Sequence, residues 1–263
     1  MAIRKTTKER IRRGVLYAVL IAAVVVVIVA ADWQRLADQF FQIDIAVELL
    51  PEIITIAARN TVLFTLIAFT GGLVLGVLLA LMKLSTIRPY RWLANIYIEL
   101  FRGLPALLTI FAMAYVLPIG FGIRVPYGAV GAGLVGLILV AAAYMAETIR
   151  AGIQGVPKGQ AEAARSLGMS AGRTMLSITL PQAFRIIIPP LTNEFVLLIK
   201  DTSLLFIAGS TLQTKELTTF TRDALSTYAN GTPLLMAAML YLIITIPLTW
   251  LVARLERRTA RAR

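Results

Sequence analysis

The chain carries neither cysteine nor histidine in its 263 residues. Without cysteine it can form no disulfide bond, bind no metal through thiolates and use no cysteine nucleophile. Without histidine it lacks the commonest general base and the usual zinc ligand. Carboxylates, hydroxyls and cations are the chemical groups that remain, which argues against a membrane-embedded enzyme acting on lipid.

A phosphate-binding loop is also missing, because no G-x-x-x-x-G-K-[ST] sequence occurs. Residues 168–174 resemble one only superficially, since the glycine spacing is short and Arg173 stands where the lysine would be. The sequence offers no soluble domain of useful size either. Any ATP that this protein depends on would therefore have to be handled by another polypeptide.

Apolar side chains are abundant: 58% of the residues are hydrophobic and the mean hydropathy is +0.79. Soluble domains are about 45–50% apolar, so this composition predicts a protein of the lipid bilayer. The formal net charge of +12 would suit nucleic acid, but the basic residues cluster at the ends of apolar segments. Such clusters are typical of topology determinants beside anionic lipid, and they predict no nucleic-acid partner.

Six segments are long and apolar enough to cross a bilayer core of about 30 Å as helices. They comprise residues 15–31, 55–84, 92–117, 127–149, 186–209 and 234–253. Backbone groups in lipid must be satisfied internally and these runs are too long for strands, which predicts an all-α integral membrane protein with six transmembrane helices. The first segment also resembles a signal peptide, but its apolar run exceeds the usual length, which favours a retained helix.

The distribution of basic residues predicts the orientation of these helices. Lysine and arginine are concentrated at both termini and in residues 83–91 and 150–173. By the positive-inside rule, both termini and the loop at 150–173 face the cytoplasm. An external linker at residues 32–54 carries acidic residues and predicts a short interfacial helix over Phe40, Phe41 and Ile45. The expected domains are residues 1–54, residues 55–258 and a basic tail at 259–263.

One cytoplasmic loop has a patterned sequence, although membrane loops are normally free to vary. Its pattern consists of Glu162, Ala163 and Ala164, then Gly168, and finally Ile178, Leu180 and Pro181. This pattern resembles the signature of the membrane subunits of bacterial ABC importers, in which the loop docks onto a cytoplasmic ATPase. The wider sequence at residues 154–204 is similar to the polar-amino-acid permease branch, and the similarity extends over about residues 60–258.

The resemblance implies a type I importer permease core of five helices, preceded here by one additional N-terminal helix. It implies a permease subunit of an ATP-driven amino acid import system, with glutamate or glutamine as the preferred substrate. The implied location is the bacterial cytoplasmic (inner) membrane, crossed several times. The implied partners are a cytoplasmic ABC ATPase dimer, a second permease subunit (the same or a homologous chain) and an extracytoplasmic solute-binding protein. This chain would bind no cofactor, since ATP and Mg would be bound by the ATPase.

The residues of the coupling loop, 155–181, predict a short helix held between two turns. Residues 161–167 are good helix formers, Gly168 can take the positive φ that ends a helix, and Ser170 can cap the next one. Pro181 is expected to break the chain before the fifth span. A helix this short is not stable alone in water, so it must pack on a partner. Glu162 can pair with Arg165 or reach that partner.

Charges inside the membrane are costly and are candidates for function. Glu147 and Arg150, at the end of the fourth span, predict an interfacial ion pair. Glu99 and Arg102 lie one turn apart inside the third span, near Gly103 and Pro105, which loosen the helix. They form either part of the substrate path or a structural ion pair between helices. Their segment is similar to the family's E-x-F-R-G-T-P motif, with Leu104 in place of threonine.

The fifth span carries a second polar cluster, for which substrate contact, gating and helix packing all remain open. Its members are Asn193, Glu194, Lys200, Asp201, Thr202 and Ser203. Glu194 and Asp201 share a helix face, Pro189 and Pro190 are expected to interrupt the helix, and residues 201–203 can cap a break. Polar groups at such a break are a recurrent way to hold a zwitterion. Carboxylates here suit the ammonium of an amino acid, while Lys200 or Arg102 suits its carboxylate.

Small residues recur every four positions in two spans, at Gly72 and Gly76 and at Gly128, Ala132 and Gly136. They allow close helix approach, and packing within the chain is favoured over a seam between two copies. An ion-coupled secondary amino acid transporter is the main alternative function, with Glu99, Glu194 and Asp201 binding the ion. Inverted repeats are expected of that class, and none is evident.

Overall fold

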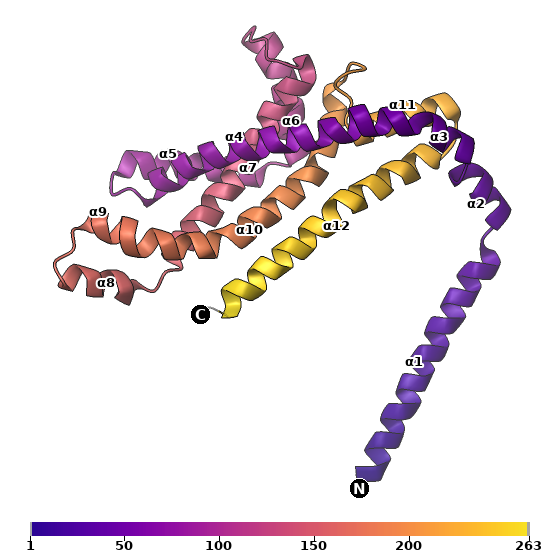
Figure 1. Ribbon diagram of the computed structural model, residues 1–263, viewed down its shortest axis with the longest axis horizontal. Coiled ribbons are helices and arrows are strands. Elements are labelled where there is room, and N and C mark those ends of the chain that lie inside the picture. Colours follow the sequence, from indigo (N-terminus) through magenta and orange to yellow (C-terminus); the bar gives the residue numbers. More distant parts are fainter. Residues whose placement is uncertain (1, 262–263) are drawn as a thin grey trace.

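The computed structural model describes residues 2–261 and shows a bundle of helices, with one helix standing apart (Figure 1). Over these residues the chain forms no β-strand. The longer helices are α1 (Ala2–Ala30), α4 (Arg59–Leu84), α7 (Gly128–Gln154), α10 (Leu180–Asp201) and α12 (Thr232–Arg261). The shorter helices are α2 (Trp33–Phe40), α3 (Ile43–Glu52), α5 (Arg88–Gly103), α6 (Ala106–Tyr115), α8 (Lys158–Ser166), α9 (Ala171–Thr174) and α11 (Leu217–Tyr228). Four π or 3-10 segments continue them: η1 (Ile53–Ala58), η2 (Val116–Gly120), η3 (Met175–Thr179) and η4 (Thr202–Ala208).

Four helical stretches in the described range are long and apolar enough to cross a membrane: Arg12–Ala30, Trp33–Leu84, Gly128–Gln154 and Thr232–Arg257. A fifth is formed by α5 and α6 with η2 if this bent pair counts as one crossing. The expected helical membrane fold is confirmed at this level. The fifth expected span, residues 186–209, is not among these stretches; its apolar run is interrupted by polar and charged side chains. Residues 262 and 263 of the predicted basic tail lie outside the described residues.

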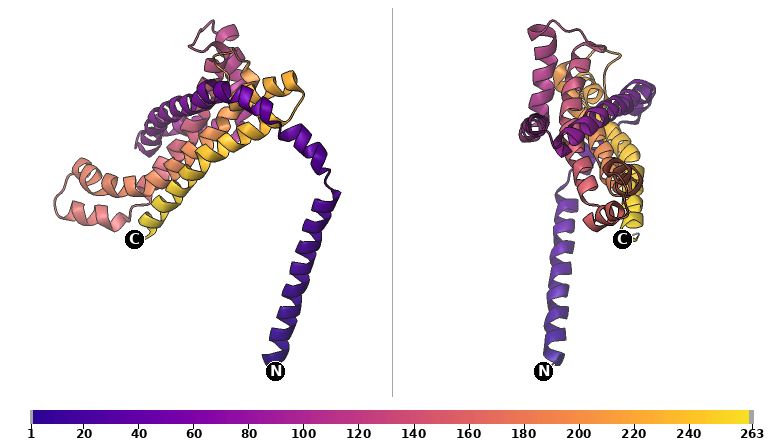
Figure 2. Two further views of the ribbon diagram at one scale, coloured as in Figure 1. Left: turned by 45° about the vertical axis from the view of Figure 1, so that its right-hand side comes forward. Right: turned by 90° about the vertical axis from the view of Figure 1, so that its left-hand side faces the viewer.

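Helix α1 extends away from the bundle in all three views (Figures 1 and 2). Its apolar side chains are exposed on every side, from Val15 (56%) to Val29 (77%). A helix that is apolar all round is suited to lipid rather than to water. The predicted first span therefore exists as a helix, and it contributes little to the core of the chain.

The bundle is built on close contact between α4 and α7, which lie side by side (Figure 1). A Cβ added at Gly72 would lie 2.9 Å from Cβ of Ala141, and one at Gly76 would lie 3.0 Å from Cβ of Met145. On α7, a Cβ at Gly136 would lie 2.8 Å from Cα of Ile110 in α6. These glycines pack helices within the chain, as the spacing of small residues favours.

The third predicted span is two helices rather than one. The chain bends by 105° between α5 and α6. Leu104 takes an extended conformation (φ −88°, ψ 141°) immediately before Pro105. Proline disfavours the helical conformation of the preceding residue, so Pro105 breaks this helix instead of only loosening it.

Two other proline predictions are wrong. Pro181 does not break the chain, because it occupies the first turn of α10, where proline's missing N–H is not needed. Pro189 and Pro190 lie inside α10, which continues without interruption to Asp201. Prolines are tolerated inside membrane helices because neighbouring groups can satisfy the backbone atoms that they free.

The linker after α1 also differs from the single interfacial helix that was expected. It consists of α2 and α3, with Phe41 and Gln42 between them. This break is fastened to the loop before α12 by three hydrogen bonds: from Gly231 N–H to Gln39 O (2.6 Å), from Asn230 Nδ2 to Asp38 O (2.9 Å), and from Gln42 N–H to Thr232 Oγ1 (3.0 Å). Contacts with a loop that lies 190 residues later decide where the helix stops.

Candidate functional site

Helix α8 projects at one end of the molecule, and α11 lies at the opposite end (Figure 1). The end of α8 has the geometry that the sequence predicts. Gly168 has φ +86°. Its N–H donates to Arg165 O (3.0 Å), and Met169 N–H donates to Ala164 O (3.1 Å). These two bonds form a Schellman motif, in which the left-handed residue is usually glycine.

The turn after α8 is fixed by two more polar contacts. Arg165 Nη1 donates to Met169 O (2.7 Å), so Arg165 holds the turn, and no ion pair between it and Glu162 occurs among the described residues. Ser170 caps α9 by accepting a hydrogen bond from Arg173 N–H (3.3 Å). The capping role predicted for Ser170 is confirmed, and the rest of the loop leads through η3 directly into α10.

Most of the coupling-loop pattern lies at the surface. Glu162 and Ala163 are exposed, while Ala164 is buried against the chain's own helices. Leu167 is 86% exposed, which is unusual for a leucine in an ordered turn. The later members are Ile178 and Leu180, which are half-buried, and Pro181, which is exposed. Leu167 thus leaves an apolar side chain uncovered at the end of this short helix.

The polar cluster of the fifth segment lies where α10 changes into the 3-10 helix η4. Asp201 is the last residue of α10, and Thr202 is fully buried and donates to Ile199 O (2.7 Å). Glu194 lies two turns earlier and is half-buried. Asn193 and Lys200 are exposed, and Ser203 is half-buried. The break that residues 201–203 were expected to cap is absent, because α10 continues directly into the 3-10 helix η4 and the Asp201 side chain makes no capping bond.

Arg102 of the bent third segment lies near this cluster. Its guanidinium sits over the ring of Tyr144, 5.5 Å from the ring centroid. Arg102 and Asp201 both lie close enough to Glu194 to interact with it electrostatically. Glu99 is exposed, and no ion pair between it and Arg102 occurs in the described part of the chain. The fold thus brings Arg102 toward the cluster of α10.

The ion pair predicted between Glu147 and Arg150 is present, with Nη2 of Arg150 2.8 Å from Oε2 of Glu147. Lys83 contacts the other oxygen of the same carboxylate from the end of α4. All three side chains are largely buried, with exposed fractions of 23% for Lys83, 17% for Glu147 and 28% for Arg150. Sequence reasoning missed Lys83, because residues 64 positions apart gave no signal of their contact.

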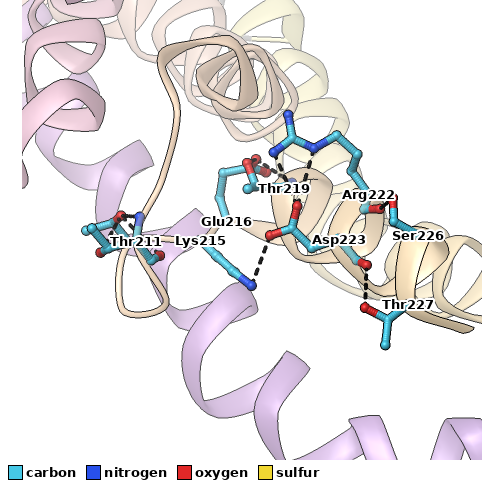
Figure 3. A network of polar contacts seen from close by, with 9 residues as sticks. Thr211, Lys215, Glu216, Thr219, Arg222, Asp223, Ser226 and Thr227 are labelled. Carbon is cyan, nitrogen blue, oxygen red and sulfur yellow. Dashed lines mark hydrogen bonds and ion pairs between the residues drawn. The ribbon is translucent and has the colours of Figure 1, made fainter.

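A second polar network lies at the end opposite α8, before and within α11 (Figure 3). Glu216 is 1% exposed and accepts hydrogen bonds from the N–H groups of Thr218 (2.6 Å) and Thr219 (2.7 Å). Burial raises the pKa of Glu216, and these bonds offset part of that effect. Burial also acts to raise the pKa of Asp223, but its ion pairs with Lys215 and Arg222 outweigh it and lower that pKa overall.

Known proteins resemble most of this chain. Residues 72–261 match the family described as binding-protein-dependent transport system inner membrane component. The probable glutamine ABC transporter permease protein GlnM of Bacillus subtilis is 40% identical over 206 residues, which cover 77% of this chain and 91% of the relative. The glutamate/aspartate import permease protein GltK of Escherichia coli O157:H7 is 34% identical over 211 residues, which cover 76% of this chain and 90% of the relative.

Solved structures agree with this likeness. A crystal structure of an amino acid ABC transporter with histidines matches with a TM-score of 0.72 and 36% identity, over 81% of this chain and 96% of that chain. An inward-facing MetNI methionine ABC transporter matches with a TM-score of 0.65 and 19% identity, which supports the fold alone.

Proposed function

We infer, from the premise that this chain belongs to the family of binding-protein-dependent transport system inner membrane components, that it is the permease subunit of an ATP-driven amino acid importer. Permease subunits of this family are not enzymes, and the ATPase is a separate subunit. Relatives named for glutamine, arginine and glutamate/aspartate support an amino acid as the substrate. Glutamine or glutamate is the first choice to test.

The observation that carries this proposal is the geometry of α8 and its turn. A rigid Schellman turn at Gly168 presents the exposed Leu167 beside a short helix at one end of the bundle. We expect α8 to fit a groove on a cytoplasmic ATPase dimer, with Glu162 and Ala163 in the contact. Movement of the ATPases would then be passed to α10, because the loop runs through η3 into that helix without a break.

In the proposed membrane arrangement, α10 with η4 supplies the sixth crossing and both termini lie in the cytoplasm. Helix α8 then lies on the inner face and α11 on the outer face of a bacterial inner membrane. A second permease chain, the same or homologous, completes the path, and an external solute-binding protein delivers the substrate. ATP and Mg are bound by the ATPase subunits.

The proposed substrate path runs past the polar cluster where α10 meets η4. Glu194 and Asp201 offer carboxylates to the ammonium of an amino acid, and Arg102 offers a guanidinium to its carboxylate. At Thr202 the helix narrows from α to 3-10 geometry, so the carboxylates lie beside backbone atoms whose hydrogen-bond pattern changes. Closure of the ATPases on ATP would turn this path outward, and hydrolysis would return it inward.

The decisive experiment changes Gly168 to aspartate. The substitution penalises the positive φ and adds a charge to the proposed contact, so we expect ATP-driven uptake to fall at least tenfold, roughly 1.4 kcal/mol in coupling. Gly122→Asp is the matched control, because Gly122 also has positive φ (+64°) and open space but lies in the turn after η2. Equal uptake by the Gly168→Asp variant, with normal ATPase stimulation, would refute the proposed coupling.

Collapse of uptake by a protonophore while ATP remains intact would instead favour the ion-coupled alternative. Uptake that vanadate inhibits and that needs a co-purifying ATPase supports the importer.

A further inference from the structure

A cavity of about 530 Å³ opens at the end of the bundle opposite α8. Its walls come from η1 and the start of α4, from the loop before α7, and from the turn before α11. The lining residues are Thr55, Ile56, Arg59, Asn60, Leu63, Tyr127, Thr211, Gln213 and Thr214. Small-molecule sites have volumes of roughly 300–1,000 Å³, so this cavity is large enough for a free amino acid. It is separate from the cluster at Glu194 and Asp201, which lies on other elements.

Arg59 is the one charged residue among those that line the cavity. The guanidinium of Arg59 makes no hydrogen bond or ion pair in the described part of the chain, although Glu52 lies two turns before it; only the backbone N–H of Arg59 is bonded, to Ile56 O. An arginine guanidinium carries donors arranged to hold a carboxylate through two parallel hydrogen bonds. The guanidinium of Arg59 is therefore available to bind a carboxylate group in the cavity.

Asn60 places a hydrogen-bond acceptor beside this cation. Its Nδ2 donates to Gln213 O (2.8 Å) and to Lys215 O (2.9 Å), which fixes the amide and the turn that it holds. With both amide protons used, Oδ1 is left as the acceptor of this side chain, and no hydrogen bond to it occurs among the described residues. Thr211 and Thr214 bond to each other at 3.0 Å and stiffen the same wall. A rigid acceptor next to a cation suits a ligand that carries both charges.

Tyr127 forms another wall, in an unusual conformation. Its backbone has φ +66°, in the left-handed region that a bulky residue rarely adopts. Its ring packs edge-on against Phe64, with centroids 5.6 Å apart, and 46% of the residue is exposed. Such strain persists where the surrounding structure imposes it, and it clusters at binding sites. The ring offers an aromatic face on which an ammonium group can rest.

We propose that this cavity is an entry site that binds the head group shared by all α-amino acids. The carboxylate pairs with Arg59, and the ammonium lies between Oδ1 of Asn60 and the ring of Tyr127. The side chain of the ligand is left toward the opening, so the site accepts amino acids as a class. The inference rests on the proposed function, and it adds a first stop for the substrate before the path at Glu194 and Asp201.

The absence of cysteine makes a direct test possible, because one introduced thiol is the only labelling site. Gln213→Cys puts a thiol on the cavity wall, and the full-length protein in nanodiscs is labelled with an anionic (sulfonate) or a cationic (trimethylammonium) methanethiosulfonate. We expect the anionic reagent to react faster, and L-glutamine to slow the reaction at least threefold. L-Glutaminamide, which lacks the carboxylate, should protect poorly. Ser226→Cys, at an exposed position of α11 outside the cavity, should show no protection by either compound.

Arg59→Gln should abolish both the preference for the anionic reagent and the protection by L-glutamine. Arg59→Lys should keep the preference and lose most of the protection, because one ammonium cannot bind a carboxylate through the same two bonds. Arg124→Gln, an exposed arginine outside the cavity, should behave as the parent. Equal protection by L-glutamine and L-glutaminamide, or protection that survives Arg59→Gln, overturns the proposal. ATP-driven uptake by the unmodified protein is measured in parallel, and its absence would overturn the proposed function instead.

Discussion

Replacing Gly136 by alanine should weaken the contact between α6 and α7. The added Cβ would lie 2.8 Å from Cα of Ile110, 2.9 Å from Thr109 O and 3.1 Å from Ile110 N. Contacts between carbon atoms settle at about 3.5–4.0 Å, so the two helices must separate locally by roughly 0.7 Å. The three nearest atoms all belong to the backbone, which cannot move aside by rotating a side chain.

The size of this effect follows from two opposing terms. Overpacking of this kind costs about 1–3 kcal/mol. Alanine regains about 0.5–1 kcal/mol, because glycine is the poorer residue inside a helix. The balance is a loss of roughly 0–2.5 kcal/mol in the free energy of unfolding, with a central value of about 1 kcal/mol.

Reversible unfolding in mixed detergent and dodecyl sulfate micelles measures that free energy. Gly159→Ala is the matched control, because Gly159 lies within α8 and no heavy atom lies within 4 Å of its added Cβ. This control should be as stable as the parent or slightly more stable. A Gly136→Ala variant that matches the stability of its Gly159→Ala counterpart would refute the reasoning about close helix contact.

Three further outcomes follow from the charged groups. Glu147→Gln removes the shared partner of Lys83 and Arg150, so the free energy of unfolding in mixed micelles should fall by about 1–3 kcal/mol, and an unchanged value would contradict the role of this bridge. Asp201→Asn should lower amino acid uptake about tenfold while ATPase activity persists, and normal uptake would remove Asp201 from the proposed path. The lowered pKa of Asp223 means that its contribution to stability is present above the unfolded-state pKa, about 3.9, and is lost as the pH falls through the lower folded-state pKa. Thermal unfolding of the parent should therefore shift more steeply below about pH 4 than that of Asp223→Asn, and parallel curves would argue against this assignment.

Local chemistry made the coupling loop predictable. Position 168 has a positive φ, which few residues other than glycine adopt. Ser170 caps the helix that follows it by accepting a hydrogen bond from the N–H group three residues later. Both depend only on near neighbours in the chain. Pro189 and Pro190 misled for the opposite reason, since a proline interrupts a membrane helix only where neighbouring groups fail to satisfy the backbone atoms that it frees. Pro181 misled for a local reason, because it falls in the first turn of α10.

Composition and spacing determined by themselves that this chain is helical, lies in a membrane and carries a patterned loop between apolar segments. Those properties depend on apolar side chains and on their periodicity, both of which follow directly from the order of residues in the sequence. Only the tertiary structure decided that Lys83 joins Glu147, that Arg102 approaches Glu194, and that Asn60 holds the turn at residue 213. It also formed the cavity around Arg59 and Tyr127. Each of these depends on contacts between distant segments, whose energies arise only when the helices pack.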